Sequence, residues 1–329
     1  MEFFINTAHD PAYNLALEEL LASEYDREFL MLWRNGPSVI VGRNQNTLAE
    51  IDADAVRELG VKVVRRTTGG GAVYHDLGNF NYTIARSGRL TRQESFADSA
   101  QVVVAALRTM GVPAEFSGRN DIIVSGRKIS GSARRVFRDR TLFHGTMLFD
   151  VDLGVLGRVL NPDAEKIRAK GVKSVRSRVM NLRELFPDWT IETFREKFVS
   201  ALLTGIGVEK PSPLPEGFAE RAEQLAVSRY RTREWNFGSP YPYDFKNRCR
   251  FPGGTVEVAL RVENDRISSI RFHGDFFGDA PVEELAELLV GAPLRPDAIL
   301  DRLSRVRLDD YLRGITPAEL ASLFYFFSA

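Results

Sequence analysis

The stretch from Asn236 to Cys249 constrains the fold most, because one sequence pattern ends there and another begins. It opens with Asn-Phe-Gly-Ser-Pro-Tyr-Pro-Tyr, and such clustering of glycine and proline is typical of a turn or linker. Helical and alternating patterns interleave before it, whereas a pair of alternating segments and then helices follow it. With 329 residues and roughly 150 residues per domain, we expect two domains, residues 1–246 and 247–329.

The first domain is predicted to mix helices and strands. Pro11 opens an amphipathic helix with Leu15 on its apolar side and Glu18 on its polar side. Two apolar runs, 29–33 and 39–41, flank an Asn-Gly-Pro turn and predict a hairpin. Alternation over 80–85 predicts a half-buried strand. Further strands are expected at 61–64, 122–124 and 142–150, and helices at 92–110, 190–204 and 216–227.

The second domain is predicted to be a small α/β unit. Residues 256–263 alternate as an amphipathic strand, and 267–272 are expected to pair with them through an Asn264-Asp265 turn. Thr316 and Glu319 form a capping box around Pro317, which predicts a helix start. Nothing in this domain indicates chemistry.

Composition excludes several classes of protein. Lys plus Arg and Asp plus Glu both number 44, which argues against a general nucleic-acid binder and a polybasic membrane protein. The single cysteine, Cys249, excludes a disulfide framework, and the four scattered histidines offer no metal-ligand pair. Without an apolar run long enough for a bilayer or a signal pattern, we expect a cytoplasmic protein with no structural metal.

Three stretches carry candidate chemistry. Residues 65–75 place three glycines after Arg66 and between two strands, which suits backbone contact with an anion, although many such turns are plain loops.

The second stretch surrounds Lys128. Gly126 and Gly131 have the spacing of the two glycines of a P-loop, but Ser132 follows where that motif requires Lys, so the P-loop interpretation fails. Lys128 is then either a solvated charge or a lysine of a functional site.

In the third stretch, residues 170–182, basic residues alternate with small ones. This pattern is typical of a basic surface loop or of a loop that closes over an anion. Segment 119–183 holds 15 basic and 6 acidic residues, consistent with a solvated face or a phosphate-rich ligand.

In this order and spacing the stretches resemble the lipoate–protein ligase A family. The resemblance rests on RRTTGGGAVYHD, SGRNDIIV, GRKISGSA, HGTMLFDVDL and KGVKSVRSRVMNL, together with DPAYNLALEE, LWRN, VGRNQN and EWNFG. It implies an α+β fold, with a mixed sheet flanked by helices as in biotin ligases and class II aminoacyl-tRNA synthetases, plus the small accessory domain. It also implies ATP-dependent, AMP- and pyrophosphate-forming ligation of lipoate to a lysine of lipoyl domains, through lipoyl-adenylate.

The resemblance assigns roles residue by residue. Lys128 would be catalytic and bridge the lipoyl carboxyl group and the phosphate, because a lysine ammonium offsets the charge of two anions that must meet. The implied ATP and adenylate positions are Arg66, Gly71, Ala72, Val73, Tyr74, Asn120, Asp121, Lys128, Lys173, Arg176 and Arg178. The implied lipoate positions are Leu15, Trp33, Val41, Gly70, His75 and Lys128, some of which would also suit plain core packing. Asp121 is the candidate Mg²⁺ ligand. The implied partners are lipoate or octanoate and acceptor proteins, namely 2-oxoacid dehydrogenase E2 subunits and the glycine cleavage H protein.

Other functions stay open at this point. A lipoyl or octanoyl transferase of the same fold would use preformed lipoyl-adenylate or a carrier-bound acyl group, but Cys249 lies outside every motif, which disfavours a cysteine transferase. A non-catalytic lipoate- or nucleotide-binding regulator would not need Lys128. A biotin ligase fits the fold but not the RRTTGGGAVYHD stretch.

Overall fold

The computed structural model describes residues 1–88, 92–117, 120–160, 179–238 and 241–324. Their contacts divide them into two compact units. The first comprises Met1–Ile40, Leu48–Arg65 and Val73–Asn236, and the second comprises Val41–Thr47, Arg66–Ala72 and the chain from Phe237 onward. The second unit therefore includes two short segments from the N-terminal third of the sequence.

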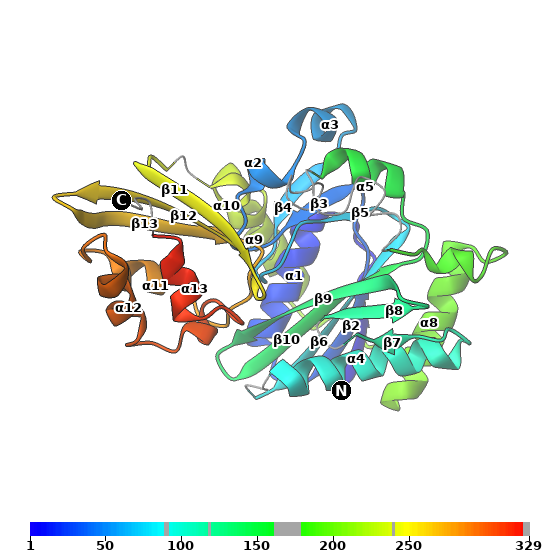
Figure 1. Cartoon of the computed structure of the whole chain (residues 1–329). Coiled ribbons are helices and arrows are strands. Elements are labelled where there is room, and N and C mark those ends of the chain that lie inside the picture. Colours follow the sequence, from blue (N-terminus) through cyan, green and yellow to red (C-terminus); the bar gives the residue numbers. More distant parts are fainter. Residues whose placement is uncertain (89–91, 118–119, 161–178, 239–240, 325–329) are drawn as a thin grey trace. The chain divides into compact units, whose positions relative to one another are not determined.

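A seven-stranded mixed sheet organises the first unit, in the order β1-β2-β6-β10-β9-β8-β7 (Figure 1). Only the β1–β2 pair is parallel. The strands are β1 (Glu2–Ile5), β2 (Phe29–Trp33), β6 (Asn79–Ser87), β7 (Glu115–Phe116), β8 (Asp121–Val124), β9 (Arg127–Phe137) and β10 (Arg140–Leu148). This mixed sheet with flanking helices confirms the predicted fold class.

Helices cover both faces of the sheet. Helices α4 (Arg92–Thr109) and α8 (Ile191–Ile206) share one apolar core with the sheet, and helix α1 (Pro11–Glu24) and α9 (Phe218–Leu225) share another. Because both faces are covered, nearly all of β6 is buried, so the prediction of a half-buried strand there was wrong. Further helical segments in the described part of the first unit are α2 (Thr47–Glu50), α3 (Ala53–Glu58), α5 (Leu153–Val159), η1 (Leu182–Glu184), η2 (Ala226–Tyr230) and α10 (Arg233–Phe237), of which Thr47 and Phe237 are counted with the second unit.

The predicted hairpin between 29–33 and 39–41 was also wrong. Strand β2 pairs with β1 and β6, whereas β3 (Ser38–Val41) belongs to a separate sheet, β4-β3-β5, with β4 (Lys62–Arg65) and β5 (Val73–His75). The turn after Trp33 therefore carries the chain from one sheet to another. The sequence alone does not distinguish this from a hairpin, because both need a turn between two apolar runs.

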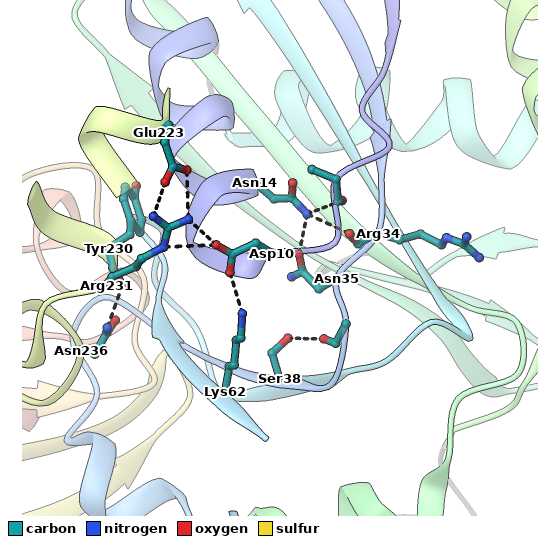
Figure 2. A network of polar contacts seen from close by, with 12 residues as sticks. Asp10, Asn14, Arg34, Asn35, Ser38, Lys62, Glu223, Tyr230, Arg231 and Asn236 are labelled. Atoms are coloured by element: carbon teal, nitrogen blue, oxygen red, sulfur yellow. Dashed lines mark hydrogen bonds and ion pairs between the residues drawn. The ribbon is translucent and has the colours of Figure 1, made fainter. Parts of the chain in front are cut away.

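Helix α1 is held at its N-terminus by charged residues from distant parts of the chain (Figure 2). The Asp10 carboxylate accepts hydrogen bonds from Arg231 at 2.6 Å and from Lys62 at 3.1 Å, and Arg231 also pairs with Glu223. Burial opposes ionisation of Asp10, but the bonds from Arg231 and Lys62 outweigh it and hold the pKa of Asp10 below its ordinary value.

The second unit contains a three-stranded antiparallel sheet, β11-β12-β13, with β11 (Phe245–Phe251), β12 (Gly254–Glu263) and β13 (Arg266–Gly274). Asn264 and Asp265 have φ of 51° and 56° and form the predicted turn. The capping box of Thr316 and Glu319 is confirmed. Both faces of β12 are buried in its first half, so it is not the simple amphipathic strand expected. The helical segments are α11 (Val282–Leu289), α12 (Pro296–Leu303), η3 (Leu308–Asp310) and α13 (Pro317–Ser322).

Candidate active site

Lys128 lies at the start of β9, just after the tight turn that joins β8 to β9. Ser125 and Gly126 make this turn with φ of 48° and 75°, the left-handed conformation that a two-residue hairpin turn requires. The Lys128 ammonium lies 2.7 Å from the Asp121 carboxylate, and the two side chains are 35% and 29% exposed. A Cβ atom on Gly131 would lie 2.4 Å from the Lys128 Nζ. The missing side chain of Gly131 therefore makes room for the ammonium group, which remains accessible to a ligand.

Strand register places a row of residues beside Lys128 on one face of the large sheet. Trp33 of β2 pairs with Asn81 of β6, Asn81 pairs with Thr146 of β10, and Gly131 of β9 pairs with Asp121 of β8. The Gly131 amide donates to the Thr146 hydroxyl at 3.2 Å, which links the two halves. Directly paired residues project from the same face of a sheet. We call these five residues the site row, and it joins the predicted lipoate residue Trp33 to the position of Lys128.

A buried polar network fixes Trp33. Its indole N–H donates to the Thr83 hydroxyl at 2.8 Å, and Thr83 donates to the Glu18 carboxylate at 2.6 Å. The His144 Nδ1 lies 2.9 Å from the same carboxylate. Glu18 is only 2% exposed, so its predicted place on the exposed side of α1 was wrong. Leu15, also buried, belongs to the same apolar cluster as Trp33.

Helical periodicity missed Glu18 because a carboxylate normally marks a solvated face. The place of Glu18 in the motif DPAYNLALEE could have indicated its burial. Two polar residues of this motif, Asn14 and Glu18, are buried in helix α1. Asn14, from the same motif, donates to Asn35 at 2.9 Å and to the Arg34 carbonyl at 2.8 Å (Figure 2). Asn35 in turn lies 3.0 Å from His75 Nδ1. The predicted site residue His75 is thus oriented from helix α1.

The three-glycine loop belongs to the second unit. Arg66 is buried and donates to the Thr68 hydroxyl at 3.0 Å, to the Gly69 carbonyl at 2.6 Å and to the Gly71 carbonyl at 2.9 Å. Through these bonds Arg66 stabilises the conformation of its own loop. Phosphate binding by Arg66 stays a prediction, and it would have to be compatible with these three bonds.

Two of the three glycines are required by packing within the second unit. A Cβ atom on Gly69 would lie 2.7 Å from the Phe276 carbonyl oxygen. Gly70 has a φ of 91°, and its Cβ would lie 3.0 Å from the ring of Phe277. Gly71 faces open space. Packing therefore accounts for glycine at positions 69 and 70 but not at Gly71, and contact of this loop with a ligand stays a prediction. Ala72 follows it, while Val73 and Tyr74 pair with β3 in the first unit.

The other predicted positions divide between the two units. Val41 and Gly70 fall in the second unit, whereas Leu15, Trp33, His75 and Lys128 fall in the first. The side-chain amide of Asn120 donates to the Ser132 backbone carbonyl at 3.0 Å, and the backbone carbonyl of Asn120 accepts from the Ser132 backbone amide at 2.8 Å. Asn120 thus closes the open end of the β8–β9 hairpin. Lys173, Arg176 and Arg178 lie outside the described residues. Shortly after them, Met180 donates its amide to the Lys128 carbonyl at 2.8 Å.

The motif EWNFG has a structural role in the first unit. The Trp235 indole donates to the Arg65 carbonyl at 2.8 Å, and the Arg65 amide donates to the Asn236 side chain at 2.8 Å. The Arg65 guanidinium donates to the carbonyls of Trp235 and Asn236. Burial lowers the pKa of Arg65 to about 10. Of the two adjacent arginines, Arg65 therefore anchors β4 to α10, while Arg66 shapes the glycine loop.

Among the described residues, no group of three or more histidine, cysteine or acidic side chains is arranged to hold a metal ion. Asp121 offers one carboxylate, and Mg²⁺ commonly uses one or two protein carboxylates together with substrate phosphates. Asp121 alone therefore supplies no complete metal site among the described residues, and its role as a Mg²⁺ ligand stays a prediction. None of the helices in the described part of the chain combines the length and apolar character needed to cross a bilayer.

The chain matches known protein families and relatives over most of its length. Residues 10–203 match the lipoyl protein ligase A/B catalytic domain, and residues 241–324 match the bacterial lipoate protein ligase C-terminus. Over 322 residues the chain is 38% identical to the lipoate-protein ligase LplJ of Bacillus subtilis, covering 96% of this chain and 97% of the relative.

Solved structures show the same fold. Plasmodium falciparum LipL1 in complex with lipoate matches 93% of this chain and 94% of its own, with a TM-score of 0.77 and 24% identity. An archaeal bipartite lipoate protein ligase, described with its E2 lipoyl domain from Thermoplasma acidophilum, matches 74% of this chain and 98% of its own, with a TM-score of 0.66 and 30% identity. A lipoate-protein ligase A bound with ATP matches 72% of this chain and 98% of its own, with a TM-score of 0.63 and 29% identity. This chain belongs to the lipoyl protein ligase A/B family.

Proposed function

We propose that the protein ligates lipoate to a lysine of lipoyl domains at the cost of ATP, through a lipoyl-adenylate. In the first step a carboxylate oxygen of lipoate attacks the α-phosphorus of ATP, and pyrophosphate leaves. In the second step the acceptor lysine amine attacks the acyl carbonyl carbon, loses a proton and forms an amide, and AMP leaves. The family relatives named for this reaction support the proposal.

The observation that carries it is the position of Lys128. Its ammonium group lies at one end of the site row, beside Gly131 and Asp121, on the sheet face that also bears Trp33. Attack of one anion on another needs a cation where the two meet, because preorganised positive charge stabilises the charge of the transition state. Lysine suits this role since its compact charge follows the oxygen from carboxylate to adenylate.

The remaining residue roles are part of the same proposal. Arg66 and the backbone of Gly71–Tyr74 would bind the nucleotide, with Asn120, Lys173, Arg176 and Arg178. Asp121 would contribute a carboxylate oxygen to Mg²⁺ that enters with ATP. Leu15, Trp33, Val41, Gly70 and His75 would line the lipoate site. The division into residues 1–246 and 247–329, like a cytoplasmic location, stays a prediction.

We propose E2 subunits of 2-oxoacid dehydrogenases and the glycine cleavage H protein as acceptors. The archaeal relative described with its E2 lipoyl domain supports this class of partner. Incubation of each purified acceptor with enzyme, lipoate and Mg-ATP should add one lipoyl group to a single lysine, seen by intact-mass spectrometry and peptide mapping. An unmodified acceptor in the presence of active enzyme would remove it from the proposal.

The test of the reaction is lipoate-dependent exchange between ATP and pyrophosphate, without acceptor protein, for wild type and Lys128→Ala. We expect exchange in wild type and its loss by at least a hundredfold in the variant. Wild type that shows no exchange but transfers lipoate from synthetic lipoyl-adenylate would instead establish a transferase. Unchanged exchange in Lys128→Ala would remove Lys128 from the catalytic role.

A further inference from the structure

The amide side chains of Asn79 and Asn81 form an incompletely paired polar group inside the first unit. Asn79 is fully buried and Asn81 is 2% exposed. The Asn79 amide donates to the Asn81 side-chain oxygen at 3.0 Å. Within the described residues, neither the Asn81 Nδ2 nor the Asn79 Oδ1 has a hydrogen-bond partner. In this orientation the unpaired nitrogen belongs to Asn81, whereas exchanging oxygen and nitrogen in both amides would move it to Asn79.

Such a group is unusual because most buried polar atoms are hydrogen-bonded. A buried amide without a partner lowers stability, so its presence calls for a reason. Asn81 is the second member of the site row, between Trp33 and Thr146. The unpaired donor therefore lies on the sheet face that carries the proposed substrate site.

Register also sets how far Asn81 lies from Lys128. Neighbouring strands are about 4.8 Å apart, so Asn81 is about 10 Å across the sheet from Gly131, where the Lys128 ammonium lies. With carbon–carbon bonds of about 1.5 Å, an extended eight-carbon acid is about 9 Å long. A carboxyl group held by Lys128 thus places the far end of the acyl chain at Asn81, next to Trp33.

The far end is where lipoate differs from a plain fatty acid. Lipoate ends in a dithiolane ring whose sulfur atoms are weak hydrogen-bond acceptors, whereas octanoate ends in hydrocarbon. A site with a buried donor discriminates against an analogue that leaves this donor unpaired. Thr146 lies one strand closer to Lys128. With the carboxyl group at Lys128, it would face methylene groups that both acids share.

We propose that Asn81 is a specificity-determining residue that favours lipoate over octanoate by donating its amide N–H to a dithiolane sulfur. This inference rests on the proposed function, since it takes Lys128 to hold the carboxyl group. The amide is presented rigidly, because strand β6 is buried and Asn79 holds the other atom of the Asn81 side chain.

The test compares kcat/KM in ATP–pyrophosphate exchange for lipoate and octanoate, in wild type, Asn81→Leu and Thr146→Val. We expect the lipoate-to-octanoate ratio to fall at least fivefold in Asn81→Leu and to stay within twofold of wild type in Thr146→Val. The ratio is measured within each preparation, so a partly unfolded variant does not distort it. An unchanged ratio in Asn81→Leu, or an equal fall in both variants, would overturn the proposal.

A second measurement uses only the wild-type enzyme. The probe is 5-cyclopentylpentanoate, which has the ring and chain of lipoate but carbon in place of both sulfurs. We expect kcat/KM at least fivefold lower than for lipoate, and equal values would overturn the proposal. Absence of any lipoate-dependent exchange would instead count against the proposed function, so the two failures are distinguishable.

Discussion

Glycine serves two different purposes in the two units of this protein. At Gly131 in the first unit, the missing side chain leaves space for the Lys128 ammonium group. At Gly69 and Gly70 in the second unit, it leaves space for Phe276 and Phe277, which come from the C-terminal part of the sequence. The first glycine makes room for the proposed catalytic lysine, whereas the other two allow a loop to pack against aromatic residues.

The difference teaches that a glycine-rich motif is not a single functional element. Lys128, Asp121 and Gly131 are brought together by one hairpin, so the local sequence is enough to assemble them. The loop around Gly70 needs residues about two hundred positions away to complete its surroundings. Substitutions in the two regions should therefore have separable effects on catalysis and on stability.

The largest expected effect is on catalysis by Gly131→Ala. The new Cβ would meet the flexible end of Lys128 rather than backbone, so the ammonium moves while the fold is kept. A displacement of about 1 Å at a reacting group costs about a hundredfold in rate. We expect this loss in exchange kcat, with a melting temperature close to that of wild type. Gly205→Ala, an exposed helix position with open space, is the matched control and should keep its rate. A fully active Gly131→Ala enzyme would contradict the role of Gly131 in making room for the Lys128 ammonium group.

Gly69→Ala should show the opposite signature. Its Cβ would meet the Phe276 backbone oxygen, which cannot move without the chain around it. Overpacking of this kind lowers the free energy of unfolding by about 1–3 kcal/mol. Urea denaturation of Gly69→Ala beside Gly71→Ala measures the effect, since Gly71 has open space and should not be destabilised. Equal stabilities for these two variants would contradict the packing role of Gly69.

Asp121→Asn tests whether the Asp121 carboxylate positions the Lys128 ammonium group. It removes the charge that pairs with Lys128 while keeping the shape of the side chain. Because both groups are about one-third exposed, stability should change by less than about 1 kcal/mol. We expect exchange kcat to fall about tenfold, because the ammonium is held less firmly. A titration with Mg²⁺ tests the other proposed role of Asp121, that of a metal ligand. If Asp121 binds Mg²⁺, the variant should need a higher Mg²⁺ concentration for half-maximal exchange.

The smallest effect concerns Asp10, at the N-terminus of helix α1. Its folded pKa lies below the unfolded value, so ionised Asp10 stabilises the folded state above the unfolded pKa of about 3.9. This stabilisation is lost as pH falls through the folded pKa. We expect Asp10→Asn to be less stable than wild type by about 1 kcal/mol near pH 7. The two proteins should converge in stability at pH values below the folded pKa of Asp10, and a difference that stays constant as pH falls from 7 would contradict the charge-based account.

Much of the architecture was predictable from local patterns. Strand β8, the hairpin turn before Lys128, the Asn264-Asp265 turn and the Thr316 capping box all follow from short-range chemistry. The failures have a common cause. Phe29–Trp33 and Ser38–Val41 lie in different sheets, and Glu18 lies in the core, because long-range pairing decides which partner a strand or side chain finds.

The site divides in the same way. The sequence by itself determined the chemistry available: a lysine among small residues, a neighbouring carboxylate and a glycine loop beside an arginine, in the order typical of one family. Only the tertiary structure decided that Gly69 and Gly70 pack against Phe276 and Phe277, that Glu18 fixes Trp33 through Thr83, and that Asn81 stands between Trp33 and Thr146. The sequence gives the type of each residue directly. The register of strands and the burial of a charge, in contrast, depend on contacts between segments far apart in the chain.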